Sequence, residues 1–163
     1  MCSAVYHVAL QAASGAKGVE MSWKNIYWDD IKEGAELPKS TREITRTMVV
    51  ATAIATRDYY PVHHDHEFAH RSGAKDIFIN ILTTNGLVSK YLTDWSGPEG
   101  EIKKFTFRLG QSAYAGDKLN MSGKVTKKYQ EGKEHLVDVE YTFAVAAGPH
   151  AVGTATMALP ARG

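Results

Sequence analysis

The residues best suited to chemistry lie in one short stretch, where Asp58 and His63 stand on either side of Pro61. Proline lacks a backbone N–H and pushes the residue before it towards extended geometry, so residues 58–64 are expected to form a loop. A carboxylate and an imidazole five residues apart in such a kinked loop can converge on one water molecule. Together they could take a proton from that water and pass it on, which is general acid–base catalysis.

The same loop residues could instead have a purely structural role. Asp58 could be only the cap of a turn, because aspartate often bonds its own backbone in loops. Among the neighbours, His64 is expected to point to solvent, and Asp65 is expected to cap a following helix. Tyr59 and Tyr60 are expected to line a pocket or an interface rather than to donate protons.

A competing motif follows directly, because residues 66–70 read His-Glu-Phe-Ala-His, and Gly73 and Asp76 continue the spacing of an extended zinc-protease motif. That chemistry needs both histidines on one face of a helix and the glutamate beside a zinc-bound water. Here Pro61 places His66 in the first turn of a short helix, and too few strands precede it for a protease sheet. We therefore expect an exposed polar helix face and no metal.

The elements around this loop can be placed from hydrophobic periodicity. Residues 43–48 suit a short strand, and residues 49–57 suit a buried helix or strand that periodicity does not distinguish. A short helix is expected over 66–71, ended by Ser72-Gly73. One long helix is expected over 77–95, since apolar residues recur there every three or four positions until Ser96-Gly97-Pro98 stops it.

The second half of the chain has the pattern of strands separated by turn residues. Strands are expected over 104–110, 118–129, 136–146 and 152–159. Four consecutive strands with turn chemistry between them indicate an antiparallel meander. One long buried helix against a curved antiparallel sheet of five or six strands is an α+β arrangement, typical of the hotdog fold.

Composition narrows the classes of function. A chain of 163 residues is expected to form a single domain, over residues 21–163, after a flexible arm at residues 1–20; translation from Met1 or Met21 stays open. The 19 basic and 18 acidic side chains nearly balance, which gives no support to a nucleic-acid or anionic-membrane partner. The sequence contains no run of about 18 apolar residues, so no membrane-spanning segment is predicted. The single cysteine, Cys2, fits a reducing, cytoplasmic compartment.

The candidate loop resembles a known motif. The MaoC-like, (R)-specific enoyl-CoA hydratases carry a loop of the form Asp-x-Asn-Pro-(Leu/Ile)-His-x-Asp, and residues 58–65 match five of its eight positions, with Tyr60 in place of the asparagine. The similarity extends from about Trp28 to Pro160. The chain is more similar still to the small hydratase subunits of actinobacterial steroid side-chain degradation, in segments at 55–58, 62–65, 75–78, 80–83 and 93–95.

This resemblance implies an activity and roles for particular residues. The protein would add water to a 2-enoyl-CoA thioester, giving an (R)-3-hydroxyacyl-CoA, without metal or redox cofactor, since coenzyme A is part of the substrate. Asp58 and His63 would hold the water, and the proton they take would return to the α-carbon. Asn80 stands where the family has a glycine, so its backbone N–H would stabilise the enolate oxygen at the start of the long helix.

The resemblance also implies a partner and leaves alternatives open. A single curved sheet has exposed edges that invite pairing, so we expect a homodimer or a heteromer with a homologous hotdog subunit. The alternatives are a weakly catalytic or non-catalytic subunit of a heteromeric hydratase, an acyl-CoA thioesterase on the same fold, and a zinc hydrolase using residues 66–70. The sequence does not identify the acyl group, although the subgroup suggests a bulky or steroid-derived one.

Overall fold

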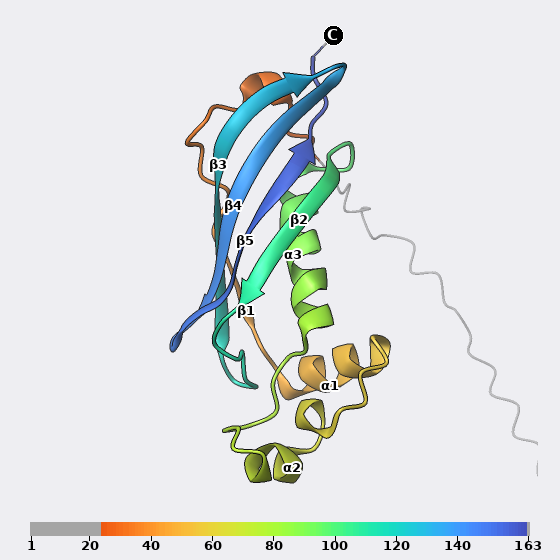
Figure 1. The fold of residues 1–163 in the computed structure, drawn as a ribbon, viewed down its shortest axis with the longest axis vertical. Coiled ribbons are helices and arrows are strands. Elements are labelled where there is room, and N and C mark those ends of the chain that lie inside the picture. Colours follow the sequence, from red (N-terminus) through yellow and green to blue (C-terminus); the bar gives the residue numbers. More distant parts are fainter. Residues whose placement is uncertain (1–23, 163) are drawn as a thin grey trace, which may run out of the picture.

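The structure is a computed structural model that describes residues 24–162, so the expected arm at 1–20 and the domain start at Met21 lie outside the described residues. Within them, short helices and one strand precede the long helix, and four long strands follow it (Figure 1). In chain order the elements are η1 (Trp28–Asp30), β1 (Ser40–Glu43), α1 (Arg46–Ala55), η2 (Pro61–His63), α2 (His66–Arg71), α3 (Ile81–Ser96), β2 (Glu101–Leu109), β3 (Lys118–Glu131), β4 (Glu134–Val145) and β5 (Gly148–Ala158).

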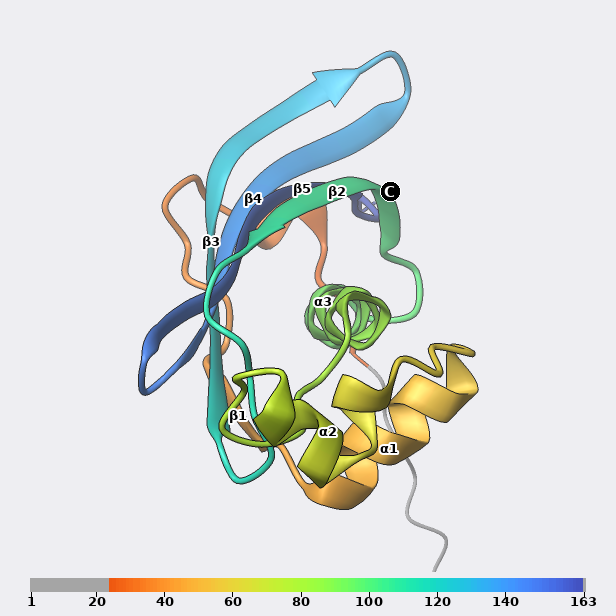
Figure 2. The same cartoon turned by 60° about the horizontal axis from the view of Figure 1, so that its bottom comes forward.

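The five strands form one antiparallel sheet in the order β1-β3-β4-β5-β2. The sheet curves around α3, which Figure 2 shows nearly end-on inside the curve. Leu92 and Val88 of α3 are fully buried against the sheet, as are Phe143 and Val139 of β4. The expected arrangement of one long helix against a curved antiparallel sheet is therefore present.

The predicted four-strand meander is wrong in one respect, because β2 pairs with β5 rather than with β3. Tight turns join only β3 to β4 and β4 to β5, whereas residues 110–117 form a longer connection that carries an isolated bridge from Tyr114 to Phe78. The β2–β5 pairing depends on Gly153, since a Cβ there would collide with the Thr106 carbonyl oxygen. The Tyr141 hydroxyl donates to the same carbonyl at 3.0 Å.

Two boundaries before the site also differ from prediction. The strand expected over 43–48 ends at Glu43, because Thr45 caps α1 by accepting the Met48 N–H at 3.1 Å. Residues 49–57 prove largely helical, but Val49 and Ala53 are the buried residues of α1, so this segment is less buried than expected. The long helix begins at Ile81 rather than at residue 77, because the stretch before it is extended and pairs with Tyr114.

Local signals placed the other helix ends correctly. Asp65 caps α2, whose first turn donates the Phe68 N–H to its carboxylate at 2.9 Å. Gly97 follows α3 with a φ of 81°, a conformation that glycine adopts without strain. Among the described residues, no helix is long and apolar enough to cross a bilayer. Figures 1 and 2 place α1 and α2 together at the N-terminal end of α3, which is where the candidate loop lies.

Candidate active site

The chain turns sharply between the end of α1 and the candidate loop. Arg57 has a φ of 56°, a left-handed conformation that is unfavourable for a residue with a side chain. The Asp58 N–H still donates to the Ala53 carbonyl at 2.9 Å, so the turn stays attached to the helix. This turn directs Asp58 towards the N-terminus of α3.

Asp58 and His63 are brought together as the sequence predicted. Their Oδ2 and Nε2 atoms lie 3.5 Å apart, and the His63 side chain is nearly buried, at 9% exposure, while that of Asp58 is 29% exposed. The other ring nitrogen of His63, Nδ1, lies 2.7 Å from the Phe78 carbonyl oxygen. A carbonyl only accepts, so Nδ1 carries a hydrogen, and in the neutral form of the ring it is the unprotonated Nε2 that faces Asp58.

The result is a pair of proton acceptors side by side at a partly exposed position. An ionised carboxylate oxygen and an unprotonated imidazole nitrogen can each accept a hydrogen from the same water. The His63 ring cannot turn freely, because Phe78 both accepts its Nδ1–H and packs edge-on against it, with 5.0 Å between ring centroids. The arrangement suits the removal of a proton from water.

Asn80 lies beside this pair, as the N-cap of α3. Its side-chain oxygen accepts the Thr83 N–H at 2.8 Å, and its amide donates to Asp58 Oδ2 at 3.0 Å. That amide lowers the pKa of Asp58 below its ordinary value, assisted by the Tyr60 N–H and by the nearby His63 and His64, although partial burial acts in the opposite direction. Asp58 is therefore an anion at neutral pH.

The Asn80 backbone N–H, the donor named from the sequence, donates to no acceptor among residues 24–162. It lies at the N-terminus of a 16-residue helix, where the helix dipole favours negative charge. The structure thus places an uncommitted donor on the residue that also contacts Asp58. Its use as an oxyanion donor stays a prediction.

Several supporting groups were not predicted. The Phe78 carbonyl and the Thr56 hydroxyl, 2.9 Å from the Asn80 amide, carry no recognisable sequence signal. The Asn80 side chain did have one, since an asparagine directly before a helical run is a preferred N-cap. His64 is exposed, as expected, and so are Tyr59 and Tyr60 at 66% and 57%.

The zinc-protease pattern at 66–70 has a different structural role. The His66 and His70 rings do share a face, with centroids 4.3 Å apart. However, His66 Nδ1 lies 3.1 Å from Asp76 Oδ1, and the other oxygen of Asp76 is paired with Arg46 at 2.6 Å. His66 is thus hydrogen-bonded to a carboxylate that also pairs with Arg46, and is not merely an exposed side chain. Within the described part of the chain, no three His, Cys, Asp or Glu residues form a metal-binding cluster.

We therefore expect purified protein to contain no stoichiometric zinc and chelators to leave its activity unchanged. His70→Ala, which removes an exposed histidine, is expected to be nearly neutral for activity, within the range of ordinary surface substitutions. Metal analysis of the purified chain, with activity measured before and after chelation, checks both. About one zinc per chain, lost together with activity in His70→Ala, would favour the zinc hydrolase instead.

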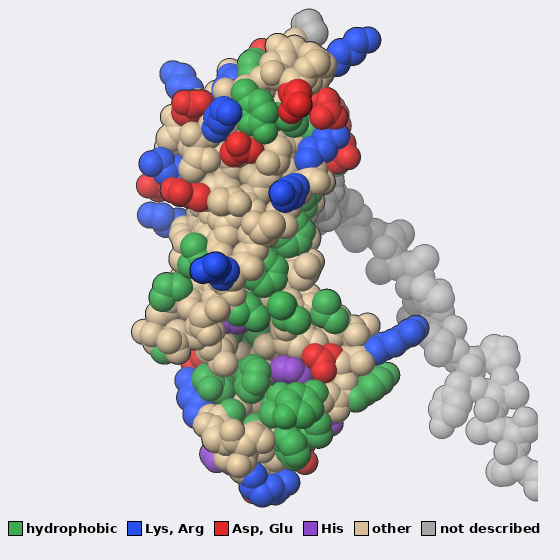
Figure 3. Space-filling view, in the orientation of Figure 1, with side chains coloured by type: hydrophobic (Ala, Val, Ile, Leu, Met, Phe, Trp, Pro, Cys, Tyr) green, Lys and Arg blue, Asp and Glu red, His purple; other side chains and the backbone are tan. Residues whose placement is uncertain are grey.

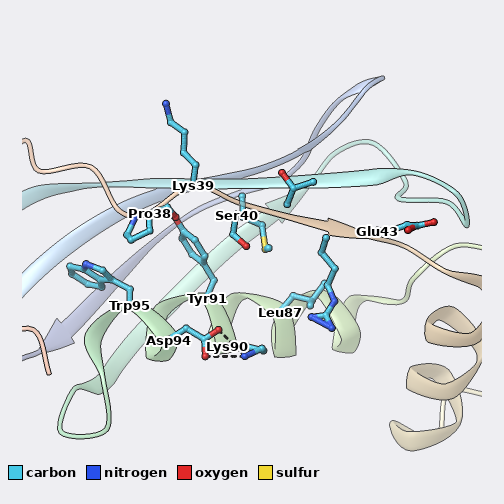
Figure 4. Close-up of a pocket in the computed structure, with 12 residues that line it drawn as sticks. Pro38, Lys39, Ser40, Glu43, Leu87, Lys90, Tyr91, Asp94 and Trp95 are labelled. Atoms are coloured by element: carbon cyan, nitrogen blue, oxygen red, sulfur yellow. Dashed lines mark hydrogen bonds and ion pairs between the residues drawn. The ribbon is translucent and has the colours of Figure 1, made fainter. Parts of the chain in front are cut away.

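A separate groove lies between β1 and α3, with a volume of about 640 Å³ (Figure 4). Leu87, Tyr91 and Trp95 of α3 line one side of it, and the Lys90–Asp94 ion pair lies at its rim. Burial raises the pKa of Tyr91 to about 12, and its hydroxyl donates to the Pro38 carbonyl at 3.0 Å. Neither Asp58 nor His63 lines this groove, so we assign it no part in the chemistry.

Comparison with known proteins places this chain in a family. Residues 31–147 match the family described as MaoC like domain. The beta subunit of 3-oxo-4,17-pregnadiene-20-carboxyl-CoA hydratase from Mycobacterium tuberculosis is 41% identical over 126 residues, which is 77% of this chain and 95% of that subunit.

Solved structures agree with that placement. The ChsH1-ChsH2 complex from M. tuberculosis contains a chain with a TM-score of 0.73 and 41% identity, covering 78% of this chain and 98% of that one. The R-hydratase PhaJ1 from Pseudomonas aeruginosa has a TM-score of 0.77 at 21% identity, covering 85% of this chain and 88% of that one. These matches confirm the predicted α+β hotdog fold. Since the family match spans most of the fold and a 41% identical relative covers 77% of the chain, this protein belongs to the MaoC-like dehydratase family.

Proposed function

We propose that this chain supplies the catalytic residues of an enoyl-CoA hydratase, which adds water to a 2-enoyl-CoA thioester to give an (R)-3-hydroxyacyl-CoA. The observation that carries the proposal is the Asp58–His63 pair, with Oδ2 and Nε2 3.5 Å apart and both able to accept a hydrogen from water. A subunit that lacked activity would have no need of this pair. The geometry of the pair therefore favours a catalytic role for this chain over a non-catalytic one.

The reaction can be followed atom by atom. Asp58 and His63 bind one water, and as its oxygen bonds to the β-carbon one of them takes the proton. The electrons of the double bond move towards the thioester, whose enolate oxygen would accept the Asn80 N–H at the positive end of α3. The proton then passes to the α-carbon from the same side, which predicts syn addition. The addition of water is redox-neutral, so the reaction needs no redox group, and the residues named here move each proton without a metal.

The acyl group is proposed to be bulky and steroid-derived, because the 41% identical relative is named for a pregnadiene carboxyl-CoA substrate. One side of the site offers exposed apolar surface on which such a group could pack. Ile54, Tyr59 and Tyr60, near Asp58 in the chain, are all more than half exposed and offer apolar surface next to it. A thioesterase on the same fold is the second candidate, since water activated by Asp58 and His63 could attack a thioester carbonyl instead.

We propose that a homologous hotdog subunit, rather than a second copy alone, completes the assembly in the cytoplasm. β2 ends the sheet, and a groove beside it is lined by Phe105 and Phe107 of β2 and by Ile81 and Leu82 of α3. Ile81 and Leu82 are 55% and 49% exposed although both are large and apolar. Figure 3 shows apolar side chains on this face of the molecule. The relative is called a beta subunit, which supports an unlike partner.

Hydration assays on short, medium and bulky 2-enoyl-CoAs test the proposal, using the chain alone and mixed with a co-encoded hotdog protein. We expect the isolated chain to self-associate but to hydrate bulky substrates poorly, and the mixture to hydrate them well, because part of the pocket wall comes from the partner. Light scattering of the same samples gives the assembly state. A monomer that is fully active on every substrate would contradict the proposed assembly, and no hydration in any mixture would contradict the activity.

A further inference from the structure

The hydrogen bonds of the Asn80 side chain fix which way its amide points. Its oxygen, Oδ1, lies 2.8 Å from the Thr83 backbone nitrogen and 2.6 Å from the Thr83 hydroxyl. A backbone N–H can only donate, so the atom facing it must be the amide oxygen and not the nitrogen. Both hydrogens of Nδ2 therefore point away from α3, towards the end of α1 and the candidate loop.

Both of those hydrogens have an acceptor. Nδ2 lies 2.9 Å from Thr56 Oγ1 and 3.0 Å from Asp58 Oδ2. The Thr56 hydroxyl gives its own hydrogen to the Thr52 carbonyl at 2.7 Å, so it faces Asn80 as an acceptor. Asn80 is only 3% exposed, and its side chain uses every donor and acceptor it has. A buried amide satisfied in this way holds one orientation.

The carboxylate oxygen that receives this amide is the one next to His63. Oδ2 is 3.0 Å from Asn80 Nδ2 and 3.5 Å from His63 Nε2, while Oδ1 accepts the Tyr60 N–H at 3.3 Å. Asp58 is partly exposed and follows the strained Arg57, and the contact that its own turn gives the carboxylate is the long one from the Tyr60 N–H. The amide is the contact that joins this carboxylate to the rigid end of α3.

We propose that the Asn80 side chain is a positioning residue for the hydration reaction, which holds Asp58 Oδ2 beside His63. This inference rests on the proposed function and is separate from the role of the Asn80 backbone N–H, which every residue but proline would supply. The same side chain thereby caps the long helix and orients the proposed base.

The charge around Asp58 is consistent with this role. The titratable groups that act on it, His63 and His64, come from its own loop, whereas Asn80 at the start of α3 is uncharged and is bonded to the uncharged Thr56. A neutral donor stabilises the anion without lowering the basicity of the water-binding pair as much as a nearby lysine or arginine would. An acceptor in place of the Asn80 amide nitrogen should therefore repel the Asp58 carboxylate.

Asn80→Asp separates positioning from capping, because aspartate caps a helix about as well as asparagine. It puts a second carboxylate against Asp58 where the amide hydrogen was, and we expect kcat for hydration to fall about 100-fold in the assembled enzyme. Asn80→Ser keeps a capping oxygen and adds no charge, and we expect a fall of about 10-fold. Thr45→Asp, which places the same charge at the N-cap of α1 away from the site, is the matched control and should keep wild-type kcat.

A titration that needs no substrate distinguishes this inference from the proposed function. Carbon-13 NMR of the Asp58 carboxyl, assigned by its loss in Asp58→Asn, should show protonation at higher pH in Asn80→Ser than in wild type or Thr45→Asp. An unchanged titration, or normal kcat in both Asn80 variants while Asp58→Asn is inactive, would overturn the positioning role and leave the proposed function standing. If the Asn80 variants do not fold, Thr56→Val removes the other acceptor of the amide and should likewise lower kcat; a normal kcat there would overturn the inference.

Discussion

Asp58→Asn and His63→Ala are each expected to lower hydration of a 2-enoyl-CoA by about two to four orders of magnitude, the range for loss of a general acid–base group. Asparagine keeps the shape of Asp58 but cannot take a proton, and alanine removes the only imidazole whose ring nitrogen faces that carboxylate within the described residues. Because both side chains act on one water, the double mutant should be little worse than the worse single mutant. Steady-state kinetics of the assembled enzyme measure all three.

The exposed neighbour His64 provides the control for this experiment. His64→Ala removes an imidazole from the same loop, one residue from His63, and should change the rate by no more than an ordinary surface substitution does. Circular dichroism should show that every variant keeps the fold. Near-normal turnover in both Asp58→Asn and His63→Ala would show that the residues of this loop do not carry out the reaction.

Leu82→Arg is expected to weaken assembly by at least about 100-fold and to abolish partner-dependent hydration, because an unpaired cation buried in an apolar contact costs several kcal/mol. Leu82 lines the groove beside β2 and is 49% exposed in the single chain, so the substitution should leave the fold of that chain intact. Sedimentation of the mixed subunits, with activity on the same samples, measures both effects.

Val152→Arg is the matched control for the interface. Val152 is similarly exposed, at 47%, but it lies on β5 and does not line the groove between α3 and β2. We expect this variant to assemble and to hydrate substrate as the wild type does. Normal assembly of Leu82→Arg, or dissociation of Val152→Arg, would show that the partner binds another surface.

The sequence predicted well those elements whose boundaries depend on local chemistry. The Asp65 cap and the Ser72-Gly73 end of α2 are local signals, and so is Gly97 at the end of α3. The start of α3 was misplaced because Ile77 and Ile79 are buried in an extended segment, and apolar residues alone do not distinguish a strand from a helix there. The pairing of β2 with β5 joins residues about 50 positions apart. Turn residues show which consecutive strands are connected by a turn, but they do not show which distant strands pair.

The candidate site divides in the same way. Asp58 and His63 could be named because their side chains are of types suited to proton transfer and their spacing resembles a known motif. The Phe78 carbonyl could not, since every residue has one, and only the tertiary fold brings this one to His63. The contact of the Asn80 amide with Asp58 likewise joins α3 to a loop 22 residues earlier. The two proposed reacting groups could therefore be named from the sequence, while the contacts that orient them could not.

The most direct test of the central claim is the isotopic composition of the product. Substrate is incubated with the assembled enzyme in ¹⁸O-labelled heavy water, and the products are identified by mass spectrometry and chiral chromatography. We predict an (R)-3-hydroxyacyl-CoA that carries ¹⁸O on its β-carbon and deuterium on its α-carbon, formed at least about 100-fold more slowly by Asp58→Asn than by the wild type. Free coenzyme A with ¹⁸O in a released carboxylic acid would instead show hydrolysis of the thioester, and would contradict the assignment of this site to hydration.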